Sequence, residues 1–278
     1  MRFTKMQGTG NDFIIIDCRK SKVPSPKKLA VSMCDRHYGV GADGILLLLN
    51  SRRADFRMRI FNPDGSEAEM CGNGIRCFAK YLYDNRITGK KQLDIETAAG
   101  IKTLNLIVRK GKVSSVMINM GEPILRRDRI PMIGDQGMVL GETLQLDDGT
   151  KFVITSLSMG NPHVVIFVED TEKFPIEKYG PQVENHPLFP NRANVEFVKV
   201  LNRREVIQRT WERGTGETLA CGTGASAVTV ACIMNRLTER AILIHLRGGD
   251  LKTEWRDDDN CIYLTGPSVR VFSGEWSG

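Results

Sequence analysis

Two stretches of the sequence have the same form: residues 70–85, MCGNGIRCFAKYLYDN, and residues 220–235, ACGTGASAVTVACIMN. In each, a cysteine precedes a glycine-rich turn, and a run long enough for a helix follows. Glycine permits the tight turn and leaves the backbone N–H groups at the helix start unobstructed. The two stretches therefore predict helices over residues 75–83 and 225–234, each beginning beside a cysteine.

The two predicted helices differ in their apolar pattern. In the first, Ile75, Phe78, Ala79 and Leu82 are spaced i, i+3, i+4, i+7, which predicts one apolar face on an otherwise polar helix. The second is apolar nearly all round, which predicts that it runs through the middle of a lobe and is covered by strands. The remaining apolar runs are short or alternating and predict strands over 13–16, 45–49, 101–108, 164–168, 195–200 and 241–246.

The cysteine turns belong to an internal repeat with an offset of 150 residues. At this offset Asn11 aligns with Asn161, Glu67 with Glu217, and Cys71-Gly72-Asn73-Gly74 with Cys221-Gly222-Thr223-Gly224. The same offset therefore aligns two elements in each half: a predicted strand that begins near the asparagine, and a predicted helix about sixty residues later. This agreement predicts two pseudo-symmetric lobes.

Composition and charge narrow the class of function. The 278 residues are 41% hydrophobic and 26% charged, as in an ordinary globular protein, and the net charge of +6 is spread along the chain rather than gathered for nucleic acid. No apolar run approaches the roughly 18 residues that span a bilayer, so we expect a cytoplasmic protein without a membrane partner. Seven cysteines without a secretion signal predict reduced thiols, and the lack of a C-x-x-C pair argues against a metal site.

Cys71 and Cys221 are candidate acid–base residues because a helix N-terminus favours a thiolate. A thiolate on one face of a carbon removes a proton, and a thiol on the other face returns one, which inverts a stereocentre. The pattern therefore predicts a cofactor-independent amino-acid racemase or epimerase with its site in a cleft between the lobes. The other cysteines are predicted to be structural: Cys18, Cys34, Cys77, Cys232 and Cys261.

Several groups near the two cysteines are suited to hold an amino-acid substrate. Glu212 offers a counter-charge for an ammonium group, and Arg213 offers a fork for a second carboxylate. Asn62 stands in an Asn-Pro-Asp-Gly turn and is either a turn residue or a ligand, while His163 is either a core histidine or a group that adjusts a thiol pKa. Two backbone nests are predicted to grip a carboxylate, at Gly72, Asn73, Gly222 and Thr223. Three more cleft amides are predicted at strand starts, at Asn11, Asn161 and Asn194.

Over essentially its whole length the chain resembles the diaminopimelate epimerase family. The motifs that carry the resemblance are Gly8-Thr9-Gly10-Asn11-Asp12-Phe13, Phe61-Asn62-Pro63-Asp64-Gly65-Ser66, Met70-Cys71-Gly72-Asn73-Gly74-Ile75-Arg76, Met159-Gly160-Asn161-Pro162-His163, Asn191-Arg192-Ala193-Asn194-Val195-Glu196-Phe197, Glu212-Arg213-Gly214-Thr215-Gly216-Glu217-Thr218 and Ala220-Cys221-Gly222-Thr223-Gly224. The resemblance implies interconversion of LL- and meso-2,6-diaminoheptanedioate, a step of lysine and peptidoglycan-precursor synthesis, without a cofactor.

The resemblance also assigns roles to residues. It makes Cys71 and Cys221 the acid–base pair, lets His163 and Glu212 adjust the thiols, and implies a homodimer with Phe272 at the contact. Gly44 replaces a glutamine that reaches the substrate in some members, so only backbone is left there. The implied substrate contacts are the side chains of Asn11, Asn62, Asn161, Asn194, Glu212 and Arg213 and the backbone of Gly72, Asn73, Gly222 and Thr223.

The fold implied by the resemblance is α+β, with two pseudo-symmetric lobes, each a set of mainly antiparallel strands wrapped around a central helix. Residues 1–118 with 263–278 are expected to form the lobe that carries Cys71, and residues 119–262 the lobe that carries Cys221.

Two other functions stay open on the sequence. Proline or hydroxyproline racemase shares the two-cysteine core, although Asn73 stands where those racemases usually resemble Cys-Gly-His. A non-catalytic protein that binds a zwitterionic metabolite would use the same backbone nests without proton transfer.

Overall fold

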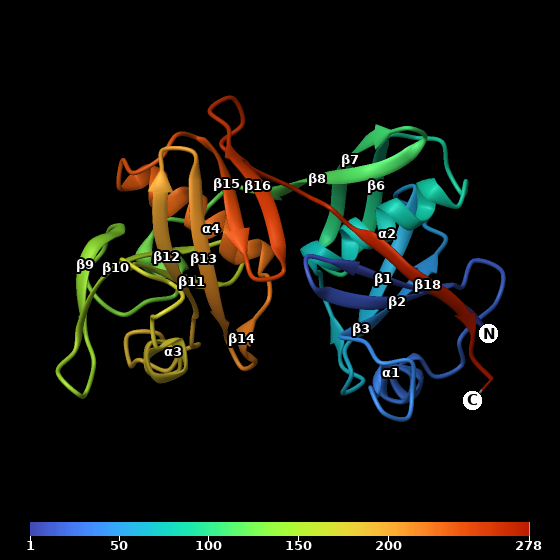
Figure 1. Ribbon diagram of the computed structural model, residues 1–278, viewed down its shortest axis with the longest axis horizontal. Coiled ribbons are helices and arrows are strands. Elements are labelled where there is room, and N and C mark those ends of the chain that lie inside the picture. The colour runs from blue at the N-terminus through green and yellow to red at the C-terminus, as the bar shows by residue number, and fades with distance from the viewer. Residues whose placement is uncertain (278) are drawn as a thin grey trace. The chain divides into compact units, whose positions relative to one another are not determined.

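The computed structural model describes residues 1–277. These residues form two compact units, one made of Met1–Asn119 together with the C-terminal segment from Thr265, the other of Met120–Leu264. In Figure 1 each unit is a strongly twisted sheet with one helix on its inner side. No helix within residues 1–277 combines the length and the apolar character needed to cross a membrane.

The first unit is a sheet in the order β18-β1-β2-β3-β4-β6-β7-β8, with the short strand β5 on β4. All neighbours are antiparallel except β2 with β3 and β4 with β6. Its elements are β1 (Arg2–Gly8), β2 (Asn11–Asp17), α1 (Pro26–Cys34), β3 (Gly44–Leu49), β4 (Phe56–Phe61), β5 (Glu67–Ala68), α2 (Gly72–Asp84), β6 (Gln92–Thr97), β7 (Gly100–Arg109), β8 (Lys112–Gly121) and β18 (Val269–Glu275).

The second unit repeats this connectivity in the order β9-β10-β11-β12-β13-β15-β16, with β14 on β13. Its parallel neighbours are β11 with β12 and β13 with β15, at the equivalent places. Its elements are the 3₁₀ turn η1 (Arg127–Arg129), β9 (Val139–Gln145), β10 (Lys151–Ser158), β11 (Pro162–Phe167), α3 (Ile176–Glu184), β12 (Asn194–Asn202), β13 (Glu205–Glu212), β14 (Gly216–Thr218), α4 (Gly222–Met234), β15 (Ala241–Leu246), β16 (Gly249–Trp255) and β17 (Ile262–Gly266). The predicted α+β class with mainly antiparallel strands is confirmed.

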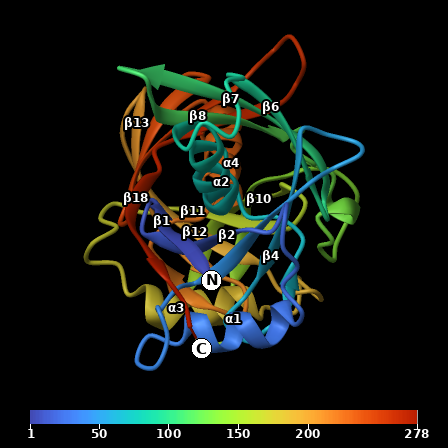
Figure 2. The same ribbon diagram turned by 90° about the vertical axis from the view of Figure 1, so that its right-hand side faces the viewer.

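Each central helix is enclosed by its own sheet. Helix α4 packs on β10, β11, β12, β15 and β16, and its residues from Gly224 to Cys232 are all buried, as its apolar composition predicts. Helix α2 packs on β1, β2, β3, β7 and β18, and Figure 2 shows it between β1–β2 and β6–β8. The predicted apolar face of α2 is confirmed, because all four of its residues are completely buried, but the burial extends beyond it to Arg76 and Cys77.

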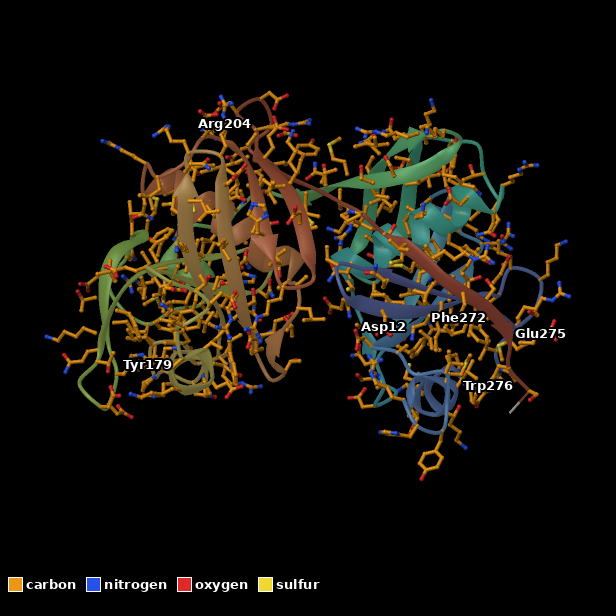
Figure 3. All side chains as sticks on the ribbon, in the orientation of Figure 1. Asp12, Tyr179, Arg204, Phe272, Glu275 and Trp276 are labelled. Atoms are coloured by element: carbon orange, nitrogen blue, oxygen red, sulfur yellow. The ribbon has the colours of Figure 1, made fainter. Side chains whose placement is uncertain are left out.

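A second helix covers the outer face of each sheet. Helix α1 covers β3 through Ala30 and Met33, and helix α3 covers β12 through Ile176 and Val183. The sequence did not predict α1 or α3, because each is only nine residues long and Pro181 interrupts the pattern of α3. Strand β18 adds the C-terminal segment to the first unit. Its Phe272 is 45% exposed and packs edge-on against Phe3 at 5.9 Å between ring centroids (Figure 3).

Candidate active site

A cysteine caps each central helix. Cys71 and Cys221 have extended backbone angles, and their Sγ atoms accept hydrogen bonds from the N–H groups of Gly74 and Gly224 at 3.4 and 3.3 Å. Oxygen-bearing residues usually fill this position, so sulfur here is a departure from the common pattern. The N–H groups and the dipole of a helix start stabilise negative charge, which suits a sulfur that alternates between thiol and thiolate.

Asparagine side chains surround Cys71 in the first unit. The Asn11 Oδ1 atom lies 3.5 Å from Cys71 Sγ and accepts a hydrogen bond from Asn73 Nδ2 at 3.3 Å. Asn11 is held in this orientation because its Nδ2 donates to the Asp43 carboxylate at 2.7 Å, and a carboxylate can only accept. Thr9 Oγ1 donates to Asn73 Oδ1 at 3.4 Å. The structure therefore brings Asn11, Asn73 and Cys71 together as predicted residues and adds Thr9 and Asp43.

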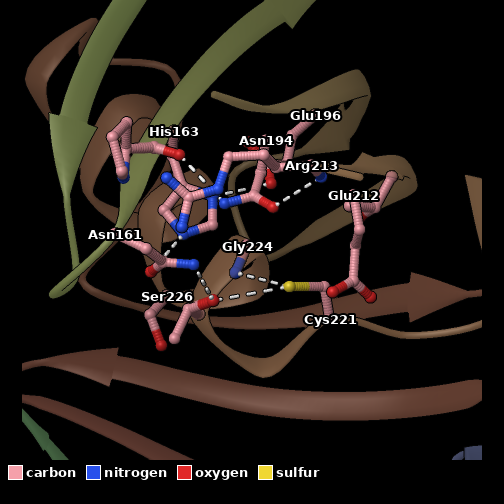
Figure 4. A network of polar contacts seen from close by, with 12 residues as sticks. Asn161, His163, Asn194, Glu196, Glu212, Arg213, Cys221, Gly224 and Ser226 are labelled. Carbon is pink, nitrogen blue, oxygen red and sulfur yellow. Dashed lines mark hydrogen bonds and ion pairs between the residues drawn. The ribbon is translucent and has the colours of Figure 1, made fainter. Parts of the chain in front are cut away.

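A chain of polar contacts leads to Cys221 in the second unit (Figure 4). The Thr223 hydroxyl lies 3.4 Å from Cys221 Sγ and accepts a hydrogen bond from Asn161 Nδ2, also at 3.4 Å. Asn161 Oδ1 lies 3.0 Å from His163 Nε2, and His163 Nδ1 lies 2.8 Å from Glu196 Oε1. His163 and Glu196 are completely buried, so this chain runs from the core of the unit to the sulfur.

The surroundings of Cys221 oppose its ionisation more than they support it. Burial, followed by the carboxylates of Glu212 and Glu196, raises the pKa of the Cys221 thiol well above its ordinary value, while Thr223 and the Gly224 N–H act in the opposite direction. Burial also raises the pKa of Glu212, against the hydrogen bond that Thr218 Oγ1 donates to it at 2.6 Å. A change in charge on Glu212 therefore changes how readily Cys221 gives up its proton.

Among the cysteines predicted to be structural, burial is the leading influence on the pKa of Cys18, Cys34, Cys77 and Cys232. Burial alone raises the pKa of Cys232 to about 12, and burial is also the leading cause that raises the pKa of Cys18 to about 11 and of Cys77 to about 12. Such thiols stay protonated at neutral pH, in keeping with a packing role.

Asn194 and Arg213 form a second polar group in the same unit. Asn194 Oδ1 accepts a hydrogen bond from the Arg213 backbone N–H at 3.0 Å, and its Nδ2 donates to the Pro162 carbonyl at 3.0 Å. The Arg213 side chain is exposed, and its Nη1 donates to the Asn191 carbonyl at 2.9 Å. This arrangement leaves an anchored guanidinium available to a carboxylate.

Asn62 lies in the predicted turn and bonds within it. Its backbone N–H and its side-chain Nδ2 both bond to Ser66, and its carbonyl accepts from the Gly65 N–H at 2.9 Å. Gly44 opens β3, where a Cβ atom would stand 2.8 Å from the Phe61 carbonyl oxygen. The close backbone packing of β3 on β4 therefore explains why no side chain stands at residue 44.

The contacts add groups that the sequence did not single out, above all Arg76 and Glu196. Glu196 stands within the apolar run of β12, where the equivalent residue of β3 is Leu46. Arg76 occupies the position of Ser226 on the equivalent helix. A comparison of the two repeats residue by residue would have marked both positions as charged in only one copy.

Comparisons with known proteins show the family. The family model described as "Diaminopimelate epimerase" matches residues 3–125 and 155–271. The chain belongs to the diaminopimelate epimerase family. Proteins named diaminopimelate epimerase are 52% identical over 275 residues in Acetivibrio thermocellus, covering 99% of this chain and 98% of theirs, and 54% identical over 279 residues in Pelotomaculum thermopropionicum, covering 99% of both.

Solved structures share the fold of this diaminopimelate epimerase family member. A phenazine biosynthesis protein of the PhzF family from Bacillus anthracis matches with a TM-score of 0.73 and 19% identity over 100% of this chain and 99% of its own. A hydroxyproline epimerase from Agrobacterium vitis matches with a TM-score of 0.71 and 15% identity over 99% of this chain and 91% of its own. At these identities the likeness concerns the fold alone. The predictions of the family and of an isomerase are confirmed by the close relatives.

Proposed function

We propose that this protein interconverts LL- and meso-2,6-diaminoheptanedioate by a two-base mechanism in which Cys71 and Cys221 act on one α-carbon. The observation that carries the proposal is the repeated cysteine cap: at equivalent positions of two enclosed helices, a sulfur accepts the third N–H of the helix. The relatives that are about half identical over 99% of the chain carry the name diaminopimelate epimerase, which supports the choice of substrate.

The proton balance of this mechanism needs only the two sulfurs. A thiolate takes the α-proton, so the C–H bond breaks as an S–H bond forms, and the electron pair stays on the carbon beside the carboxylate. The opposite thiol then breaks its S–H bond and returns a proton to the other face. Helix N-terminal N–H groups at Gly72 and Asn73, and at Gly222 and Thr223, would bind the carboxylate and stabilise the developing charge.

The second charged end of the substrate would be bound by the polar residues near Asn194. The Arg213 guanidinium has five donors in a planar fork, which matches a carboxylate, and Glu212 provides the negative partner for an ammonium group. Asn62, Asn161 and Asn194 are proposed to complete the binding of the two zwitterionic ends. Proline has no second ionic end, so it would leave Arg213 without a ligand.

The test is hydrogen exchange during turnover in deuterated water. We expect deuterium at the α-carbon of diaminopimelate with the native protein, and losses of more than about a thousandfold in both Cys71→Ser and Cys221→Ser, since each removes one of the two acid–base groups. Turnover without deuterium uptake, or activity retained in both variants, contradicts the two-thiol mechanism. Binding without exchange would indicate a zwitterion-binding protein, and rapid exchange of free proline would indicate the racemase alternative.

We also propose a cytoplasmic homodimer that uses strand β18. On the described chain β18 pairs with β1 only, and Val269, Val271 and Phe272 on it are 48%, 55% and 45% exposed. An apolar edge strand is an aggregation hazard unless another chain covers it. Light scattering of the native protein and of Phe272→Glu tests this, with a dimer expected for the first and a monomer for the second. A monomeric native protein contradicts it.

A further inference from the structure

Arg76 is a buried cation without a carboxylate partner. Its side chain has no exposed surface, and within residues 1–277 it makes no ion pair. It donates only to neutral acceptors, namely the Gly72 carbonyl at 3.3 Å, Thr9 Oγ1 at 3.1 Å and the Pro267 carbonyl at 3.3 Å. An arginine side chain stays protonated in proteins, and a buried charge is retained only where something compensates it.

The fold does not require a cation at this place. In the second unit the equivalent residue is Ser226, whose Oγ donates to the Gly222 carbonyl at 2.9 Å, the same first-turn carbonyl that Arg76 reaches on α2. A hydroxyl is therefore sufficient for the helix start. What Arg76 adds is a positive charge under the Cys71 turn. It is joined through Thr9 and Asn73 to the Asn11 amide, whose Oδ1 contacts the sulfur.

We propose that Arg76 is a positioning residue that supplies the counter-charge of the Cys71 thiolate. The proposal deepens the two-thiol mechanism and rests on it. It also makes the two halves electrostatically unequal. The Asp43 carboxylate, which reaches the Cys71 group through Asn11, is paired with Arg36, whereas the charges near Cys221 are the carboxylates of Glu212 and Glu196. In the resting enzyme Cys71 is then the base and Cys221 the acid.

Two other contacts bear on this assignment. Burial lowers the pKa of Arg76, while charge on Cys77 and, after it, on Cys71 acts in the opposite direction. Since burial keeps Cys77 protonated, with a pKa of about 12, Cys71 is the thiol of the two that can form a thiolate partner for the cation. The Asn11 carbonyl favours the thiol instead, but at 3.5 Å and with a weak S–H donor this bond is marginal. The Arg76 guanidinium is completely buried, so little water screens its charge.

The experiment measures the pH dependence of alkylation by iodoacetamide at Cys71, resolved by mass spectrometry, without substrate. In Arg76→Met, which keeps the apolar stem, we expect an alkylation rate at pH 7 about tenfold lower and a profile moved to higher pH. Arg76→Lys keeps the charge and is expected to stay within about threefold of the native rate. Cys221 in the same samples is the internal control, and its profile should not move.

The structural alternative is that Arg76 only holds the C-terminal segment on α2, through the Pro267 carbonyl and the hydroxyl of Ser268, which donates to the Arg76 carbonyl. In that case the Cys71 profile of Arg76→Met superimposes on the native one, which overturns the proposal whatever happens to turnover. A profile moved equally in Arg76→Lys and Arg76→Met overturns it too. If Arg76→Met does not fold, Arg76→Ser, which copies the second unit, replaces it with the same expected shift. Because alkylation needs no diaminopimelate, a failed substrate assignment leaves this result unaffected.

Discussion

The strand residues beneath the Cys71 turn are apolar, whereas the strand residues beneath the Cys221 turn are polar. A Cβ atom on Gly74 would touch Leu46 and Phe13 at 3.4 Å, while one on Gly224 would stand 2.6 Å from Glu196 Oε1. The buried residues at equivalent positions are Phe13 and His163, Leu46 and Glu196, Met58 and Gln208, and Ile60 and Thr210. Since the first unit forms the same strands with apolar residues at these four positions, the polar residues of the second unit are not needed for the fold and point to a role at Cys221.

The largest effect is expected from His163→Phe, which places the residue of the first unit in the second. It leaves both oxygens of the buried Glu196 carboxylate without a hydrogen-bond partner, since Oε2 already has none, and should lower the free energy of unfolding by about 3–5 kcal/mol. Adding Glu196→Leu should restore most of that loss. Urea unfolding of the two single variants and of the double variant gives the interaction energy between residues 163 and 196. If the two single losses in the free energy of unfolding add up in the double variant, the pair does not interact.

A smaller difference is expected between the two helix starts. Gly224→Ala should lower the free energy of unfolding by about 1–3 kcal/mol, because its Cβ also meets Gln208 Nε2 at 3.1 Å in a filled core. Gly74→Ala meets only ordinary contacts and should gain up to about 1 kcal/mol from helix propensity. Thermal and urea unfolding check this, and equal effects at the two positions would refute the difference in packing.

The free energy of unfolding should depend on pH below neutrality through Asp12, a carboxylate in the first unit. The equivalent residue of the second unit, Pro162, cannot titrate. Burial disfavours ionised Asp12, but hydrogen bonds from Arg36 and Lys5 outweigh it and lower the pKa to about 2. This stabilisation is present above the unfolded pKa of 3.8 and is lost as the pH falls through 2. Asp12→Asn should therefore cost about 2 kcal/mol at pH 7 and little near pH 2. Unfolding curves at both pH values measure it, and a loss independent of pH would exclude the linkage.

The smallest change in stability is expected from replacing Glu212, whose equivalent in the first unit is Asn62. Its raised pKa means that the folded state holds the proton more tightly than the unfolded state, whose pKa is 4.5. Stability should fall as the pH rises from 4.5 through the folded pKa, and Glu212→Gln should flatten this dependence by about 1 kcal/mol or less. Asn62→Asp is the matched variant on the exposed turn, where no such dependence is expected. An unchanged slope in Glu212→Gln would show that the burial has no energetic effect.

The sequence predicted the parts of the fold that depend on local pattern and repetition. The two helices beside Cys71 and Cys221 begin three residues earlier than predicted, because the Gly-x-Gly turn is already helical. The six predicted strands all exist, whereas α1 and α3 were missed because short amphipathic helices give weak periodicity. Among the candidate site residues, the structure joins Asn11 and Asn73 to Cys71, joins Asn161, His163 and Thr223 to Cys221, and leaves Asn62 in its own turn.

By itself the sequence determined the repeat, the family, and the two cysteines at helix starts, because these are properties of residue order and of the backbone next to it. Only the tertiary structure decided what lies under each turn. Arg76 and Glu196 come from segments whose local pattern predicts nothing unusual, and they matter because the fold buries them completely. Burial removes the water that would weaken a charge, so equivalent cysteines on equivalent helices meet opposite electrostatic surroundings.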